Sequence, residues 1–83
     1  RDAQGRAWVS VTGSDGRTAS VWSDTSCSFW QVYTGDDLPP HLRRRGMAAE
    51  PMTAAPDAFN SGDGLTVLGP GDSATATWGA VLT

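Results

Sequence analysis

The fold is decided by residues 7–22, which read AWVSVTGSDGRTASVW. The first six residues alternate, so that Ala7, Val9 and Val11 share one face of an extended chain. The letters GSDG follow, and they suit a tight turn because Gly tolerates a positive φ and Asp and Ser bond to nearby backbone. Alternation resumes at Thr18. This pattern predicts an antiparallel β-hairpin.

The same period of two recurs along the rest of the chain. Residues 28–34, SFWQVYT, are rich in aromatic and β-branched side chains, and residues 47–50 form a short extended segment. Residues 53–64 are rich in Pro, Asp, Asn and Gly, which predicts a loop with turns. The expected strands are 7–12, 18–22, 28–34, 65–68 and 74–82. No segment has a helical stripe, so the sequence predicts an all-β, antiparallel fold, one section of a β-sandwich.

Length and composition narrow the class of protein. The chain has 83 residues, enough for one small domain, and its first letters, RDAQGR, have the character of a connection. We therefore expect residues 1–83 to be one section of a single larger domain. The net charge of −3, without any Lys, argues against a nucleic-acid partner. No apolar run approaches the eighteen or so residues of a membrane span, so no membrane partner is expected.

Cysteine usage and the N-terminal residues suggest a compartment. No signal-peptide pattern opens the sequence. Cys27 is the only Cys, which excludes an internal disulfide framework and a multi-Cys metal site. A single thiol fits a reducing environment, so we expect a cytoplasmic protein.

Glu50 is the only Glu in the chain, and Pro51 follows it. The proline ring clashes with a helical predecessor, so Glu50 is restricted to extended conformations. A carboxylate held in one backbone region can be aimed at a substrate as a general base. The alternative, which the local sequence alone favours, is a solvated Glu at the end of a strand.

Gln31 lies inside an expected strand, between Trp30 and Val32. Its side chain has both a carbonyl and an amide to satisfy, and a sugar hydroxyl would satisfy either. A solvent-facing strand position is the simpler alternative. Six of the seven aromatic residues offer a sugar-stacking platform or the filling of a sandwich core, and we expect the core for most of them. They are Trp8, Trp22, Phe29, Trp30, Tyr33 and Trp78.

Three further groups of residues have chemistry but no convincing pattern. The letters RRR at residues 43–45 could bind an anion, but a solvated loop is expected because the chain is acidic overall. His41 with Asp36 and Asp37 matches no metal-binding spacing, so no metal is expected. Cys27 has no neighbouring base in the sequence and is expected to be buried or inert.

Three segments resemble motifs of the aldose 1-epimerase, or galactose mutarotase, family. Residues 31–36, QVYTGD, are similar to the motif Gln-x-Tyr-Thr-Gly-Asn/Asp. Residues 50–60, EPMTAAPDAFN, resemble Glu-x-Gln/Met-x-x-x-Pro-Asp-Ala-x-Asn, in wording closest to bacterial aldose-epimerase-like proteins. Residues 68–72, LGPGD, resemble the turn Leu-x-Pro-Gly-Glu/Asp before the last strand. The segments occur in the order that the family has.

The resemblance implies a fold and a reaction. The fold would be the C-terminal section of the antiparallel galactose-mutarotase-like supersandwich, with residues 1–83 belonging to one domain. The reaction would interconvert the α and β anomers of a free aldohexose, such as galactose or glucose, without a cofactor. The family's base, a Glu that takes the proton from the anomeric hydroxyl, matches Glu50. The family's sugar-contacting Gln matches Gln31.

The chain also departs from the family. The family's acid is a His that protonates the ring oxygen and lies upstream of these motifs, and His41 does not match it. The chain alone is therefore expected to have little or no mutarotase activity. It is expected to need the N-terminal remainder of its domain, or self-association, to cover its strand edges. Two alternatives remain open: a non-catalytic carbohydrate-binding module, and a structural β-domain that shares only the fold.

Overall fold

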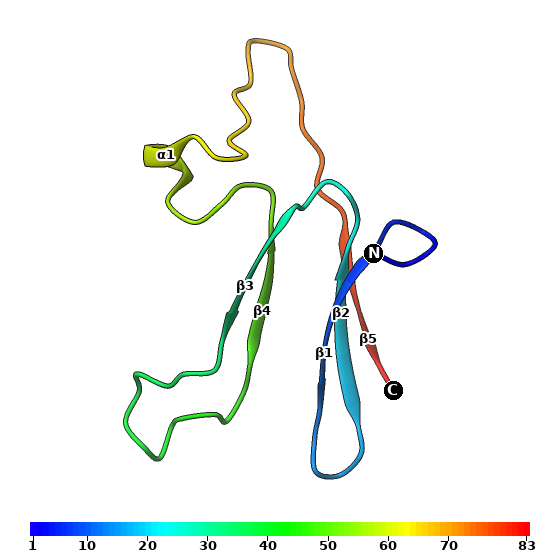
Figure 1. Cartoon of the computed structure of the whole chain (residues 1–83), viewed down its shortest axis with the longest axis vertical. Helices are drawn as coiled ribbons and strands as arrows, with labels where there is room; N and C mark the ends of the chain where they lie inside the picture. Colours follow the sequence, from blue (N-terminus) through cyan, green and yellow to red (C-terminus); the bar gives the residue numbers. More distant parts are fainter.

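The computed structural model describes residues 1–83 and is almost entirely β-structure (Figure 1). Every strand pair is antiparallel, which confirms the predicted class. The elements are β1 (Ala7–Thr12), β2 (Thr18–Ser23), β3 (Phe29–Tyr33), β4 (Ala48–Met52), the one-turn helix α1 (Ala58–Ser61) and β5 (Trp78–Leu82). No helix has both the length and the apolar character needed to cross a membrane.

The first sheet has three strands in the order β1-β2-β5. The predicted hairpin forms β1 and β2, and its turn is closed by a hydrogen bond of 2.8 Å from the Gly13 amide to the Arg17 carbonyl. Gly16 has a φ of 83°, which explains why the turn needs glycine there. Because side chains alternate across a strand, Val9 and its partner Val21 lie on one face, and the two tryptophans of these strands lie on the other.

The second sheet pairs β3 with β4 alone, joined by residues 34–47 (Figure 1). The two sheets diverge from a junction at the β2–β3 connection, where the start of β5 also arrives. The Asp24 amide donates to the Thr77 carbonyl at 3.2 Å, and the Thr77 amide donates to the Ser26 hydroxyl at 3.0 Å. The Arg1 guanidinium donates to the carbonyls of Asp24 and Cys27 at 3.0 and 3.1 Å. These bonds fix the β2–β3 connection to the residues that precede β1 and β5.

The chain is open rather than compact. Its Cα radius of gyration is 15.6 Å, whereas a compact chain of this length has about 12 Å. The buried side chains belong to Cys27, Ala58 and Ser23, which confirms the expected burial of Cys27. The aromatic residues do not form the predicted core: Trp22, Phe29 and Trp30 are half-buried, and the others are exposed. The reason is that no second layer covers either sheet in this chain.

Two predicted strands are corrected. Residues 65–68 are not a strand, because no other strand runs beside them to form a ladder, and Val67 is 84% exposed. The last strand begins at Trp78 rather than at residue 74. The predicted loop 53–64 contains α1, a single turn too short for a periodic stripe. The extended segment predicted at 47–50 is strand β4, which continues through Pro51 because either strand of a two-stranded sheet is an edge.

Candidate functional site

The two residues singled out by the motifs are direct cross-strand partners. In the β3–β4 ladder Gln31 lies opposite Glu50. Side chains directly opposite each other in an antiparallel pair point to the same face, with Cβ atoms about 5 Å apart. Both residues are exposed, so the amide and the carboxylate are available to one ligand. Residues 34–47 bring them together by reversing the chain between the strands.

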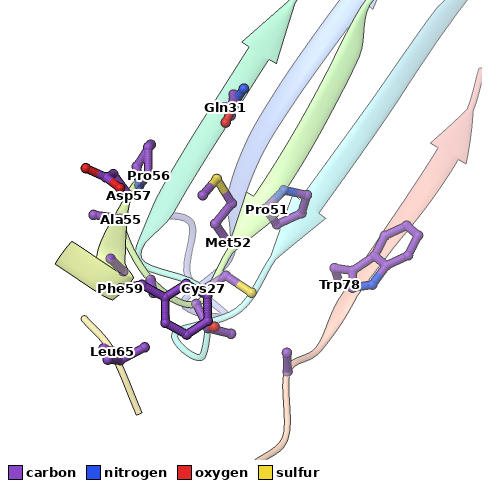
Figure 2. Close-up of a pocket in the computed structure, with 14 residues that line it drawn as sticks. Cys27, Gln31, Pro51, Met52, Ala55, Pro56, Asp57, Phe59, Leu65 and Trp78 are labelled. Carbon is purple, nitrogen blue, oxygen red and sulfur yellow. The ribbon is translucent and has the colours of Figure 1, made fainter. Parts of the chain in front are cut away.

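A hollow of about 690 Å³ begins beside Gln31 and extends toward the junction of the sheets. Figure 2 shows Gln31 at one end, Phe59 and Leu65 at the other, and Met52 between them. Most lining residues are apolar. Glu50 does not line the hollow, although its partner Gln31 does. Sequence reasoning missed this apolar wall, but the alternation that places Met52 two residues after Glu50 was a usable signal for a shared face.

The second half of the 50–60 motif shapes the chain beside the hollow. Asp57 has a φ of 62°, a left-handed conformation that Asp tolerates better than most residues. Its carboxylate accepts a hydrogen bond of 2.8 Å from the Asn60 side-chain amide, and its carbonyl accepts from the Asn60 amide at 3.0 Å. Ala58, which follows, is buried. The Asp and Asn of this motif are therefore engaged with each other in a turn that starts α1.

The arginines of residues 43–45 are exposed, as predicted for a solvated loop. The Arg44 guanidinium donates two hydrogen bonds to the Asp36 carboxylate, from Nε to Oδ1 at 3.0 Å and from Nη2 to Oδ2 at 3.1 Å. The bond from Arg44, with another from the Thr34 hydroxyl, holds the pKa of Asp36 below its ordinary value, and the same contact raises the pKa of Arg44. Arg43 Nε donates to the Leu38 carbonyl at 2.7 Å. Two of the three arginines thus bind their own loop.

The acidic residues near His41 have partners other than a metal. Asp36 pairs with Arg44, and Asp37 accepts a hydrogen bond from the Tyr33 hydroxyl. No three His, Cys, Asp or Glu side chains gather as metal ligands would. His41 is exposed in the connection between β3 and β4, and no hydrogen bond joins it to the Gln31–Glu50 pair.

Comparison with known proteins gives a short match. The chain is similar to the uncharacterized protein YihR of Escherichia coli (strain K12). The two are 49% identical over 41 residues, which is 49% of this chain and 12% of YihR. The chain thus spans a small part of this relative, whose name assigns no activity. No protein-family model matches the chain, and no solved structure matches it significantly.

Proposed function

We propose that Gln31 and Glu50 form the sugar-binding and base half of an aldose 1-epimerase site acting on a free aldohexose such as galactose or glucose. The observation that carries this proposal is their direct opposition across β3 and β4. Each residue lies in a separate family-like motif, and residues 37–49 stand between the two motifs. A shared face for the two side chains is what one sugar needs to contact both.

The chemistry assigns a different task to each group. The Glu50 carboxylate accepts hydrogen bonds only, so it is suited to take the proton from the anomeric hydroxyl. The Gln31 amide can donate to one sugar oxygen and accept from another hydroxyl, which fixes the orientation of the ring. Ring opening also requires a proton at the ring oxygen. Neither residue supplies it, so the acid is a separate group.

The apolar wall of the hollow supports the choice of a sugar. Pyranose rings have C–H faces that pack on apolar and aromatic side chains, and ligand sites combine such walls with few polar groups. Met52 and Phe59 supply the wall, and Gln31 supplies a polar group at its end. No metal or cofactor is needed for proton transfer of this kind.

The test is polarimetry on fresh α-galactose and α-glucose with imidazole added as an external acid. We expect the chain to accelerate mutarotation beyond the buffer and imidazole baseline. Glu50→Gln should lower this excess rate by about a hundredfold, the usual worth of a general base, and Gln31→Ala should lower it several-fold. Asp15→Asn, an exposed carboxylate in the hairpin turn, is the matched control and should leave it unchanged.

A second readout separates catalysis from binding. The Gln31 side-chain amide signal should shift in NMR spectra when galactose is added. A shift without any excess rate would support a non-catalytic sugar-binding module instead. Neither a shift nor an excess rate would reject both functions.

We further propose that additional strands complete the sheet that carries this site, either from the rest of a larger domain or from a second copy. A two-stranded sheet is marginal by itself, and β3 and β4 each present a free edge. Sedimentation of the chain at high concentration should show association. A single sharp monomer boundary would contradict association with a second copy.

A further inference from the structure

The face of the three-stranded sheet that carries Trp8 and Trp22 has an unusual set of side chains. Along β1 and β2 its cross-strand pairs are Trp8–Trp22, Ser10–Ser20 and Thr12–Thr18. The opposite face carries valine and alanine, with the buried Ser23 at one end. The tryptophan face belongs to the other sheet from Gln31 and Glu50, so it is a separate surface.

Both indole rings on this face are held in place. Trp8 Nε1 donates to Asp2 Oδ2 at 2.8 Å, and the ring centroids of Trp8 and Trp22 are 6.5 Å apart. The Arg6 guanidinium lies 3.8 Å from the Trp22 ring centroid. Gly79, across the ladder, leaves room for the Trp22 ring, since a Cβ there would lie 2.6 Å from it. Trp22 is thus a supporting ring, and Trp8, 43% exposed, is the accessible one.

Paired hydroxyls continue the face toward the hairpin turn. The hydroxyls of Ser10 and Ser20 are 2.8 Å apart, and those of Thr12 and Thr18 are 2.9 Å apart. Each pair uses one of its two hydrogens internally, so each keeps a donor and free acceptor positions for a ligand. At about 3.3 Å per residue, the row from Trp8 to Thr12 is about 13 Å long. The row therefore suits an extended ligand with many hydroxyls.

The charges on this face fit a neutral ligand. Asp2 and Arg6, one anion and one cation, lie beside the tryptophans and offset each other. The chain as a whole is acidic and has no Lys, which disfavours polyanions such as nucleic acids.

We propose that this face binds a neutral, unbranched oligosaccharide. One sugar ring stacks on Trp8, and the following rings hydrogen-bond to the serine and threonine pairs. A ring that is already fixed loses little conformational freedom on binding, which favours affinity. The proposal does not depend on the Gln31–Glu50 site, and Glu50→Gln should leave this binding unchanged.

The test uses cellohexaose and maltohexaose as probes with the full chain, measured by calorimetry and by the indole N–H signals in NMR spectra. We expect the Trp8 indole signal to shift with at least one probe. Trp8→Ala should weaken binding about tenfold, and Trp8→Phe should keep most of it. The matched control is Trp78→Ala, because Trp78 is 61% exposed but pairs with Ser23 and so lies on the opposite face of this sheet.

Several results would overturn the proposal. Equal weakening by Trp8→Ala and Trp78→Ala would place binding elsewhere, as would loss of binding in Glu50→Gln. Absence of binding to both probes would reject it, and so would tighter binding of an oligothymidylate. If Trp8→Ala disturbs the circular dichroism spectrum, two milder variants replace it. Retained binding in Trp8→Phe with a several-fold loss of binding in Ser20→Ala supports the proposal. Loss of binding in Trp8→Phe with unchanged binding in Ser20→Ala contradicts it.

Discussion

The two sheets of this chain differ in how many strand pairings and cross-strand side-chain bonds stabilise them. The three-stranded sheet has a tight hairpin, a central strand paired on both edges, and cross-strand side-chain bonds on its tryptophan face. The β3–β4 sheet has two strands and a long connection, and its Gln31–Glu50 pair makes no side-chain hydrogen bond. The paired hydroxyls of the first sheet bond to each other across the strands, whereas Gln31 and Glu50 of the second sheet do not.

This difference determines which contacts stabilise each sheet. Cross-strand pairs stabilise a sheet by fractions of a kilocalorie each, and a central strand adds ladder bonds on both sides. A two-stranded sheet lacks that support and depends on contacts outside its own ladder. Here those contacts come from the junction near Cys27 and from the segment around Gly64, which packs on Phe29. Substitutions should therefore affect the two sheets through different contacts.

The largest expected effect is on the three-stranded sheet. In Gly79→Ala the new Cβ would lie 2.6 Å from the Trp22 indole, so the ring must leave its place under Arg6. We expect the free energy of unfolding to fall by about 3 kcal/mol, the upper end of the usual range for overpacking, as measured by urea denaturation. Gly46→Ala is the matched control, because a Cβ there meets nothing within 4 Å. Equal stability of the two variants would contradict the packing of Trp22 over Gly79.

A smaller effect is expected at the wall of the hollow. Gly64 has a φ of 74°, and a Cβ there would lie 2.8 Å from Phe29 Cε2. Gly64→Ala should cost about 2 kcal/mol from the left-handed backbone and the contact together. Gly71 has a φ of 83°, but a Cβ there meets nothing within 4 Å. Gly71→Ala should therefore lower the free energy of unfolding by about 1 kcal/mol, from the backbone conformation alone. Urea denaturation measures both, and the Gln31 amide signal should move only in Gly64→Ala.

The same contrast explains what the sequence could predict. The hairpin was predictable because alternation and turn residues are local, and β1 matches its predicted bounds. Residues 65–68 have the composition of a strand, but a strand also requires a neighbour, which local sequence does not specify. The tryptophans were assigned to a core because their apolar area is large. Their exposure follows from the absence of a covering layer, which is a property of the whole arrangement.

The motifs name the residues of the candidate site, which stay a prediction, and they do not specify its geometry. Gln31 and Glu50 were singled out by motifs, but neither motif specifies that they are opposite each other in one ladder. The register depends on how residues 34–47 fold, including the Asp36–Arg44 pair, which joins residues across the loop. The apolar hollow forms where Phe59 and Leu65, from a separate segment, lie near the β3–β4 sheet. Local sequence patterns do not specify such a contact, so the hollow could not be predicted from them.

The smallest expected effect is a pH dependence at the junction between the two sheets. The Ser26 hydroxyl and the Ser26 amide donate to the Asp24 carboxylate, and these bonds lower its pKa below the ordinary value of 3.8. A carboxyl whose pKa is depressed by folding stabilises the folded state above its unfolded pKa, and this contribution is lost as the pH falls through the folded pKa. Asp24→Asn should therefore be less stable than the parent at pH 6.

Thermal melting of both proteins at steps between pH 6 and pH 2 measures this effect. The gap between their melting temperatures should narrow below about pH 4 and close at the acid end, because a protonated Asp24 and an Asn are both uncharged. Asp2 and Asp36 also have lowered pKa values, but they titrate in both proteins and cancel in the difference. A gap that stays constant would mean that the charge of Asp24 does not stabilise the junction, and that the Arg1 guanidinium and the Thr77 backbone hold it in place without that charge.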